Sequence, residues 1–419
     1  MQRVRETQTL LGAWHAIRRN GETSTSRQTR EEVRKFGADL PRNLRRLQER
    51  LRNLYAFEKQ YGATPYKDKS RPEKGKRPLV IAPLRDRIVQ RAILDVLQDA
   101  RELEGVQRVL ETPTSVGGIR RRGVDDAIRQ IEAKRLKGEA NFVAGSDISG
   151  FFTTINKASV VNFVRAETDD DAFIDLFKRA LDVELVNVAA LGPEDYAMFP
   201  TAETGVAQGC PLSAFAGNVA LRDFDHDMNG NGITCIRYID DFILLSAKKS
   251  KVEKAFRSAG AKLKALGMTI YLPEENPGKA FMGEFAGGFE FLGYQLKPGL
   301  YPPALKNQKR LLEAVRNELK VGEAHIRRTL CDPLNGKALQ RYAQTLVEVD
   351  NRVKAWSGTF KESRCLATAK AIDSQVNELI SAFIAFYRDQ TESRSQLEKR
   401  RLLGVHVIED DVRLRCGRP

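Results

Sequence analysis

The sequence is poor in the residues that build disulfide frameworks and zinc sites. Its five cysteines lie far apart along 419 residues, and none has a nearby cysteine or histidine at the spacing of metal ligands. No apolar run approaches the roughly 20 residues that a membrane span needs, and nothing resembles a signal peptide. We find no internal repeat and no long low-complexity tract. These absences argue against a disulfide scaffold, a zinc module and a membrane protein, and predict a cytoplasmic chain.

The composition is that of a globular protein with an excess of basic residues. Apolar residues make up 42% of the chain, and 419 residues suit two or three domains. The formal net charge is +14 and the pI is near 9.5. An excess of this size favours a polyanionic partner, with nucleic acid the leading candidate. The alternative is a protein whose surface is basic in general.

The first 140 residues combine helical patterns with a polar tract and a short strand. Between Arg30 and Phe57, apolar residues recur every three or four positions with arginines between them, which predicts one amphipathic helix. Its basic face either lies along RNA or is simply solvated. Residues 61–75 are polar and rich in Lys, Pro and Gly. Residues 78–81 then predict a strand and 86–97 a helix.

The middle of the chain mixes strands and helices, whereas the end is helical. β-Branched and aromatic runs within 141–155 and 233–246 predict strands, and helical patterns surround them. After Tyr301 no further strand pattern is found, and apolar residues repeat at helical spacing over 339–356 and 372–386. The predicted fold class is therefore α+β, with a separate helical domain after it.

Two adjacent acids, Asp240 and Asp241, lie between apolar runs, where charge is unexpected. A β-hairpin with the acids at its turn accounts for this pattern. Because neighbouring side chains alternate between the two faces of a strand, the pair need not serve equally, and Asp240 is the stronger candidate for a metal ligand. For an isolated pair of acids, an ordinary polar turn is the alternative.

A third acid, Asp147, ends an apolar strand pattern and precedes a turn. Alone, it would be read as the cap of the following helix. Together with Asp240 and Asp241 it supplies the carboxylates that hold two Mg²⁺ ions about 3.5–4 Å apart in phosphoryl transfer. Hard cations of this kind take oxygen ligands, so histidine and cysteine are not needed there.

Three segments resemble the motifs of reverse transcriptases, in the order that the family has them. Arg77–Pro83, with Asp86–Gln90 after it, resembles the fingers motif of group II intron and other bacterial enzymes. Gly205–Ser213 resembles the glycine-glutamine-glycine segment before the palm helix. Arg237–Asp241 resembles the tyrosine-x-Asp-Asp hairpin, with isoleucine at the variable position. Their order and spacing identify the chain as a member of this family.

The resemblance implies the α+β architecture of a right-hand polymerase. A helical extension over 1–60 would precede the fingers, at 61–140. The palm, at 141–300, would contain a βαββ-type sheet and an inserted helical segment at about 160–204. A helical thumb or C-terminal domain would follow over 301–419.

The resemblance also implies the chemistry, which is RNA-directed synthesis of DNA. The substrates would be an RNA template, a DNA primer and product, and dNTPs. Two Mg²⁺ ions, with Mn²⁺ as an alternative, would be held by Asp147, Ile148, Asp240 and Asp241. A membrane is not among the implied partners, and homo- and hetero-oligomers both stay open.

Residues of the fingers and the early palm are implied to bind the incoming nucleotide. Arg77 would contact the triphosphate, since a planar guanidinium binds phosphate oxygens in pairs, and Lys69 or Lys67 would add a point charge. Phe152, five residues after Asp147, would leave no room for a 2′-hydroxyl and so favour dNTPs. Without the resemblance, Phe152 would be read as a core residue.

Later residues are implied to complete the nucleotide and primer sites. Gln208 would lie against the nucleotide sugar and the template pair. Lys279 would protonate the leaving pyrophosphate, although surface lysines are common. Phe291, Leu292 and Gly293 resemble the segment that grips the primer end, and the same residues would also make an ordinary strand and turn.

Short flanking segments point to a branch of the family. Ala13–Gly21, Lys354–Gly358 and Arg401–Gly404 look most like the single-domain, defence-associated bacterial reverse transcriptases. That resemblance implies an associated non-coding RNA as template and a role in anti-phage defence. Retron enzymes usually carry alanine where this chain has Ile239, which disfavours a retron. A group II intron maturase that acts as an RNA-binding splicing factor is the alternative, and an RNA polymerase is a third option.

Overall fold

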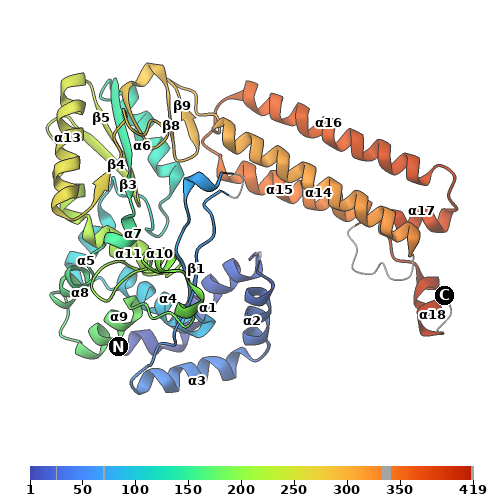
Figure 1. Ribbon diagram of the computed structural model, residues 1–419, viewed down its shortest axis with the longest axis horizontal. Helices are drawn as coiled ribbons and strands as arrows, with labels where there is room; N and C mark the ends of the chain where they lie inside the picture. The colour runs from blue at the N-terminus through green and yellow to red at the C-terminus, as the bar shows by residue number, and fades with distance from the viewer. Residues whose placement is uncertain (25, 69–70, 333–340, 417–419) are drawn as a thin grey trace. The chain divides into compact units, whose positions relative to one another are not determined.

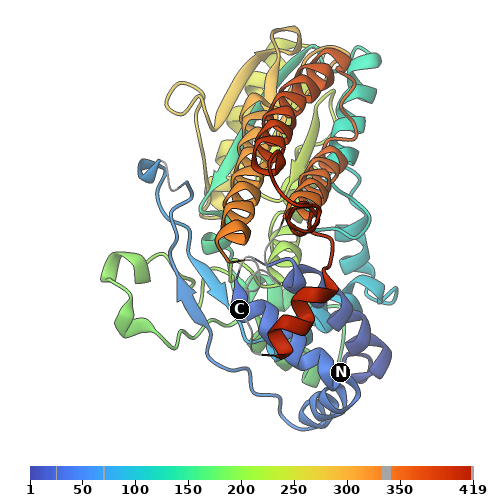
Figure 2. The same ribbon diagram turned by 90° about the vertical axis from the view of Figure 1, so that its right-hand side faces the viewer.

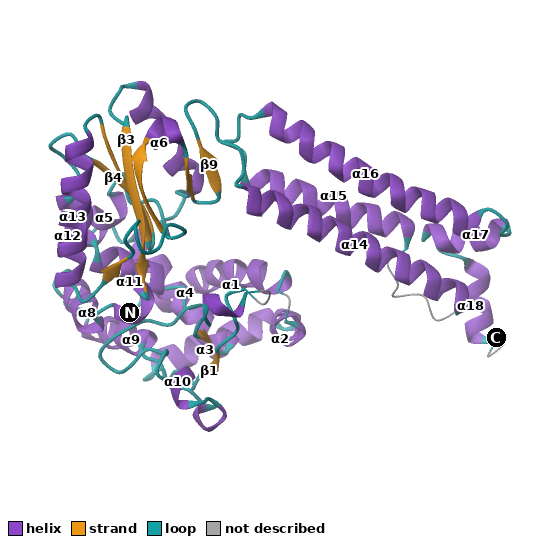
Figure 3. Ribbon diagram, turned by 45° about the horizontal axis from the view of Figure 1, so that its top comes forward, coloured by secondary structure: helices purple, strands orange, loops and turns teal. Residues whose placement is uncertain are grey.

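The computed structural model describes residues 1–416 apart from 25, 69–70 and 333–340. The chain divides into two units, Met1–Glu284 and Phe285–Pro419, and each has its own hydrophobic core. Figure 1 colours both units along the chain, and Figure 3 separates their helices from their strands. The predicted domain boundaries near residues 60 and 140 fall inside the first unit and stay predictions.

The chain begins with helices η1 (Arg3–Arg5), α1 (Thr7–Glu22), α2 (Arg27–Ala38) and α3 (Leu40–Arg52). The prediction of one helix from Arg30 to Phe57 is wrong, because the helix breaks at Asp39. Pro41 explains the break: it lacks a backbone N–H, and its ring would clash with a carbonyl one turn earlier in a continuous helix. The predicted apolar face is nevertheless buried, at Leu44 and Leu47 for example.

The predicted strand and helix follow, and the strand forms one half of a hairpin. Strand β1 (Tyr61–Ala63) pairs antiparallel with β2 (Leu79–Ile81), and helix α4 (Leu84–Asp99) begins three residues later. Between the two strands lies the short helix η2 (Pro72–Lys74). We call β1, β2 and the residues between them the finger hairpin. Helices α5 (Glu104–Glu111) and α6 (Val124–Leu136) complete this part of the chain.

The central sheet carries the predicted acids. Its strands are β3 (Phe142–Ser149), β4 (Thr234–Tyr238), β5 (Asp241–Ser246), β6 (Thr269–Ile270) and β7 (Ala280–Glu284). All neighbours are antiparallel, in the order β4-β5-β3, and β6 and β7 both pair with the remaining edge of β3. The strands predicted within 141–155 and 233–246 are thereby confirmed. Because β3 is central, its side chains are fixed from both edges.

Helices fill the chain between β3 and β4. The inserted segment holds α7 (Phe151–Thr154), α8 (Lys157–Arg165), α9 (Asp171–Leu181), η3 (Val188–Ala190) and α10 (Pro193–Tyr196). Helices α11 (Ser213–Ala220) and α12 (Arg222–Asp227) then lead to β4, and α13 (Lys249–Ala265) connects β5 to β6. The predicted α+β class is confirmed, whereas the bounds of the inserted segment stay a prediction.

One hydrophobic core joins the N-terminal helices to the central sheet. It contains Trp14 from α1, Ile88 from α4, Ala144 from β3, Phe242 from β5 and Leu263 from α13, among many others. At about 25 cal/mol per Å² of apolar surface, burial on this scale dominates the stability of the unit. The N-terminal helices therefore belong to the same folded body as the predicted fingers and palm.

The second unit is built from helices after a short hairpin. It contains η4 (Phe285–Gly287), β8 (Phe289–Phe291), β9 (Tyr294–Leu296), α14 (Leu305–Cys331), α15 (Tyr342–Thr359), α16 (Leu366–Thr391), α17 (Gln396–Leu403) and α18 (Ile408–Arg415). Helices α14, α15 and α16 run side by side (Figures 1 and 2) and share a core around Leu319, Val349 and Phe383. The helical domain predicted after Tyr301 is confirmed, although position 339 of its pattern lies outside the described residues. No helix in the described ranges is long and apolar enough to cross a membrane.

Candidate active site

Strand pairing brings the three predicted aspartates together. Asp147 on β3 lies directly opposite Asp241 on β5, so their side chains emerge on the same face of the sheet. Asp240 lies in the two-residue turn between β4 and β5, and its carbonyl accepts a hydrogen bond of 3.0 Å from the Ile148 amide. The hairpin predicted at this position is confirmed, and it ends beside the strand that carries Asp147.

The carboxylates repel one another. Burial, and after it the charge of Asp147, raises the pKa of Asp240 to about 6, while Lys279 opposes the shift. Above this pKa, Asp240 therefore carries its charge next to Asp147. A divalent cation beside them would offset this repulsion.

The chemical type of the available ligands suits magnesium. Asp147, Asp240 and Asp241 offer only oxygen ligands, which hard divalent cations prefer. Within the described ranges, no group of three His, Cys, Asp or Glu side chains forms a ready-made metal cage. Mg²⁺ does not require one, because it commonly keeps several waters and substrate phosphates beside one or two carboxylates.

Lys279 lies on the carboxylates in this structure. Its Nζ donates a hydrogen bond to Asp147 Oδ2 and stands 5.6 Å from the centre of the Tyr271 ring. Burial disfavours the charged form of Lys279, but the hydrogen bond to Asp147 outweighs it and raises the pKa of the ammonium group. The side chain remains 53% exposed, so it can leave Asp147 without unpacking the core.

Arg237, two residues before the turn, anchors the hairpin from inside the protein. Its side chain is fully buried and pairs with Asp225 of α12, at 2.7 Å from Nε to Oδ1. Further hydrogen bonds reach Ser115 Oγ, Asn218 Oδ1 and the Ile239 carbonyl, at 2.8, 3.0 and 2.8 Å. One arginine thus ties the carbonyl that precedes Asp240 to three other segments of the chain.

The turn itself is strained and tightly packed. Ile239 has a φ of 61°, in the left-handed region that β-branched residues rarely adopt. Gly117 lies so close that a Cβ there would stand 2.4 Å from the Ile239 amide nitrogen. A neighbouring backbone that leaves no room for a methyl group, together with Arg237, holds the turn in this conformation.

The predicted triphosphate residues lie on or near the finger hairpin. Arg77 is exposed, and its amide donates to the Pro65 carbonyl at 2.9 Å. Lys67 is described, whereas Lys69 lies outside the described residues. The neighbouring Lys76 forms an ion pair of 2.8 Å with Asp195 of the inserted segment.

The inserted segment also extends the finger hairpin. The Asn187 side chain donates to the Gly62 carbonyl and accepts from the Gly62 amide, at 2.9 and 2.8 Å. It therefore pairs with the edge of β1 as another strand would. Together with the Lys76–Asp195 ion pair, this contact fixes the hairpin against residues 184–196.

Phe152 and Gln208 lie on neighbouring segments of the first unit. Phe152, on α7, is half-buried, with its ring centre 5.2 Å from that of Phe151. Its carbonyl accepts from the Val206 amide at 2.7 Å, and the Gln208 carbonyl accepts from the Val80 amide of β2 at 3.0 Å. The loop that carries Gln208 thus connects the finger hairpin to α7.

The predicted primer segment forms the β8–β9 turn of the second unit. Leu292 and Gly293 both have positive φ, 48° and 85°, and Phe291 is buried. The Gly293 carbonyl is occupied, since it accepts from the Ala304 amide and from the Asn307 side chain at 2.8 and 2.9 Å. A role in primer binding would therefore fall to other backbone groups of this turn.

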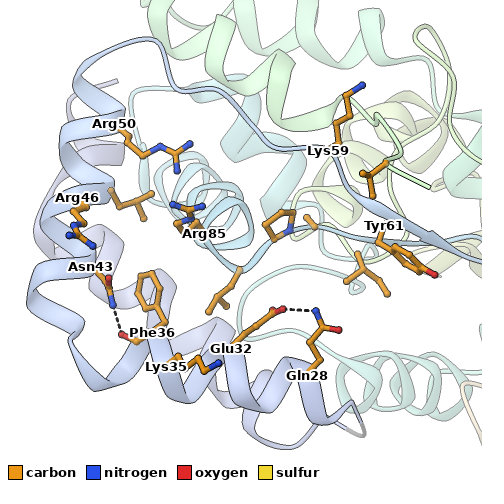
Figure 4. A pocket seen from close by; sticks show the side chains of 16 residues that line it. Gln28, Glu32, Lys35, Phe36, Asn43, Arg46, Arg50, Lys59, Tyr61 and Arg85 are labelled. Carbon is orange, nitrogen blue, oxygen red and sulfur yellow. Dashed lines mark hydrogen bonds between the residues drawn. The ribbon is translucent and has the colours of Figure 1, made fainter. Parts of the chain in front are cut away.

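A cavity of about 580 Å³ lies elsewhere in the first unit, between α2, α3 and the base of the finger hairpin (Figure 4). Phe36, Arg46 and Tyr61 are among its lining residues, and none of the three aspartates is. Two of its arginines already pair with Glu58 outside the cavity. The carboxylate site is thus separate from this cavity.

Sequence reasoning missed the residues that support the site. Asn218 and Asp225 are buried polar residues seven positions apart, Asn218 among the largely apolar residues of α11 and Asp225 in the mostly polar helix α12. That spacing places two polar groups on one buried side, a signal that they need a common partner. Ser115 and Asn187 lie in irregular segments and gave no such signal.

The fold, with Asp147 and Asp241 on adjoining strands and Asp240 in the turn beside them, defines the class: a right-hand nucleic-acid polymerase. The model of the family described as reverse transcriptase (RNA-dependent DNA polymerase) matches residues 66–296, more than half of the chain. The chain therefore belongs to the reverse transcriptase family.

Individual relatives are distant. The chain is 27% identical over 257 residues to protein YkfC of Escherichia coli (strain K12), a match that covers 52% of this chain and 63% of YkfC. A chain of a partial Cas6-RT-Cas1–Cas2 complex is also similar, at 20% sequence identity and a TM-score of 0.34. The match covers 63% of this chain and 41% of the chain in that complex. Apo telomerase from Candida tropicalis is similar at 12% sequence identity and a TM-score of 0.46. The match covers 86% of this chain and 66% of the telomerase chain. The chain thus spans less than two thirds of each of these three proteins.

Proposed function

We propose that this protein is an RNA-directed DNA polymerase that uses a two-metal mechanism. The observation that carries the proposal is the pairing of Asp147 with Asp241 beside the Asp240 turn, in a member of the reverse transcriptase family. Carboxylates on adjoining strands suit the shared ligation of two cations. The net charge of +14 suits an RNA template and a DNA primer and product.

The proposed metal ligands are Asp147, Asp240, Asp241 and Ile148. Two Mg²⁺ ions, or Mn²⁺ in their place, would activate the primer 3′-hydroxyl and offset the charge on the phosphates. With cations held at Asp147, Lys279 would no longer pair with that carboxylate, and its ammonium group would be available to give a proton to the departing pyrophosphate.

The other predicted residues select and hold the nucleotide. Arg77 binds the triphosphate, with Lys69 or Lys67 beside it. Phe152 excludes a 2′-hydroxyl, and Gln208 lies against the sugar and the template pair. The hydrogen bonds that join the loops of Phe152 and Gln208 to β2 support this assignment, because they keep the three elements together.

We further propose that the template is an associated non-coding RNA and that the enzyme acts in anti-phage defence in the cytoplasm. The support is the resemblance of three flanking segments to the defence-associated group. In the structure, two of these segments contribute packed residues: Trp14 is buried against Phe36, and Trp356 donates to the Asn307 carbonyl.

Synthesis by the purified protein tests the polymerase. The protein with its co-purified RNA is incubated with Mg²⁺ and labelled dNTPs or rNTPs. We expect dNTP incorporation, its loss after RNase treatment, and its loss in the Asp240→Ala, Asp241→Ala variant. Asp223→Ala, which removes an exposed acid of α12, is the matched control and should retain activity. Unchanged synthesis by the double variant would sink the assignment, and a preference for rNTPs would indicate an RNA polymerase.

Sequencing the co-purified RNA tests the biological role. A short structured RNA encoded beside the gene supports the defence assignment. An enclosing intron RNA would instead show a maturase that acts as a splicing factor. Phage challenge of cells with the wild-type gene or the Asp240→Ala, Asp241→Ala variant completes the test, because defence by synthesis requires the carboxylates.

A further inference from the structure

Helix α13 has the largest net positive charge of any helix in the described parts of the chain. It carries six lysine and arginine side chains and one acid, Glu253, and Lys248 immediately precedes it. Val252, Phe256 and Leu263 are among the residues that bury its opposite side. The apolar side is therefore already used by the core, and the basic side faces solvent.

Three of these cations form an outward row. Lys254, Arg257 and Lys264 are exposed, and at 100° per residue they project opposite the buried side. Their span of ten residues corresponds to about 15 Å of helix. Among the described residues, no acid forms an ion pair with any of them, whereas Lys249 and Lys262 pair with Glu253 and Asp227.

This row lies on the other side of the sheet from the carboxylates. The core that buries α13 includes Ala144 and Ile148 of β3. Asp147 is one residue from Ile148 and three from Ala144, so its side chain leaves the opposite face of the strand. A partner on the outer face of α13 therefore does not occupy the carboxylate site.

The composition of the face identifies the kind of partner. A membrane-bound helix needs an exposed apolar side with Trp, Phe or Leu, and α13 has none exposed. Protein interfaces are enriched in aromatic residues and depleted in lysine, the reverse of this face. Without an exposed aromatic ring, bases of a single strand have nothing to stack on. The partner that fits this face is a regularly spaced row of backbone phosphates, such as that of a double-stranded stem.

We propose that the outer face of α13 binds the phosphate backbone of a double-stranded stem in the RNA that the enzyme copies. The proposal rests on the proposed function, which supplies an RNA longer than the stretch held at the carboxylates. The stem is bound outside the copied stretch, so α13 retains the template RNA without taking part in the chemistry.

The test measures stem binding separately from synthesis. The variant Lys254→Glu, Arg257→Glu, Lys264→Glu is compared with Arg19→Glu, Arg27→Glu, Arg30→Glu, which makes the same charge change on exposed arginines of α1 and α2. Fluorescence anisotropy follows a labelled RNA stem of about 16 base pairs on full-length protein that already holds excess unlabelled primer–template. Synthesis is measured on a short RNA template with a DNA primer at saturating concentration.

We expect the α13 variant to bind the stem at least about tenfold more weakly, with a log–log salt slope smaller by about 2 to 3, because three phosphate contacts are lost. The α1–α2 control should bind like the wild type, and synthesis on the short template should be unchanged in both variants. Equal stem binding by the α13 variant, or an equal loss in the control, overturns the proposal. So does α13-dependent binding of phosphatidylserine vesicles in place of RNA.

The outcomes also separate this proposal from the polymerase assignment. A wild-type protein that binds the stem through α13 and makes no DNA would refute the proposed function and leave the α13 site standing. A variant that loses synthesis on the short template while it keeps the stem would place α13 in the polymerase site and refute the inference.

Discussion

Arg237 shows how a single residue sets the geometry of the carboxylate turn. A fully buried guanidinium is costly, and here the Asp225 ion pair and the hydrogen bonds to Ser115, Asn218 and the Ile239 carbonyl compensate it. Breaking one partner of a buried pair typically costs about 3–5 kcal/mol, since the other charge stays buried. The same contacts hold the strained Ile239, so the cost is linked to the position of Asp240.

Replacing Arg237 with lysine should impair the chemical step more than nucleotide binding. Lysine retains the charge but cannot reach Asp225, Asn218 and the Ile239 carbonyl together. We expect kcat to fall by at least about tenfold with little change in the KM for dNTP, since loss of alignment alone can cost two orders of magnitude. Steady-state kinetics on protein shown to be folded by circular dichroism measures this. Arg222→Lys, on the adjoining helix α12, is the control, and a change confined to KM would contradict the positioning role.

Phe152 should decide between deoxyribonucleotides and ribonucleotides. Phe152 is only half-buried, whereas Phe151 is buried against Gly217 and serves the core. Phe152→Val should therefore admit rNTPs, with the ratio of kcat/KM for dNTP over rNTP falling by about 10 to 100 times, as for a steric contact of 1–3 kcal/mol. Phe151→Leu should lower stability and leave the ratio unchanged. A ratio that stays constant in Phe152→Val refutes the gate.

The secondary elements show what periodicity can predict and what it cannot. The sheet strands, the carboxylate hairpin and α13 follow from alternation and helical spacing, which are local properties. Pro41 causes the helix break at Asp39. This proline is also a local signal, but the prediction of one continuous helix gave more weight to the apolar repeat. The contact of Asn187 with β1 joins residues 125 apart, and no local pattern encodes such a pairing.

Asn187 offers a test of how the inserted segment supports the finger hairpin. Its side chain pairs with both backbone groups of Gly62, and β1 in turn pairs with β2, which follows Arg77. Asn187→Ala should release the edge of β1 and raise the KM for dNTP several-fold, since two hydrogen bonds are worth about 1–3 kcal/mol together. The effect on kcat should be smaller. Kinetics of Asn162→Ala, an exposed residue of α8, provide the control, and equal KM values for both variants would count against the model.

At the scale of the whole molecule, the chain forms the units Met1–Glu284 and Phe285–Pro419, whereas the sequence pattern places the start of the helical domain at 301. The family resemblance implies a helical extension over 1–60 that precedes the fingers, yet Trp14 of this segment shares a core with Phe242 of the sheet. Apolar periodicity identifies a buried helix face without saying which partner covers it. The chain has two tryptophans, Trp14 in the first unit and Trp356 in the second, so the fluorescence of each follows the unfolding of one unit.

Mg²⁺ should stabilise the first unit alone, in a pH-dependent way. The pKa of Asp240, about 6, lies above that of an ordinary carboxyl group, so its charge lowers the stability of the fold as pH rises through 6. Ligation needs the charged form and offsets the repulsion, so Mg²⁺ at about ten times its dissociation constant should add about 1.4 kcal/mol at pH 8 and little at pH 5. Thermal unfolding followed by tryptophan fluorescence in a Trp356→Phe variant measures the first unit. We expect its Tm to rise by at least about 2 °C at pH 8.

The matched measurement on the second unit distinguishes a local effect from a general one. In a Trp14→Phe variant, where only Trp356 reports, Mg²⁺ should leave the transition unchanged at both pH values, because no proposed ligand lies in Phe285–Pro419. Asp240→Asn should remove the Mg²⁺ response of the first unit and raise its Tm at pH 8 without metal, since the repulsion is gone. Equal shifts of both tryptophan signals would mean that the ion acts on the general charge of the protein, or that the units unfold together. A Mg²⁺ response that persists in Asp240→Asn would remove Asp240 from the set of metal ligands.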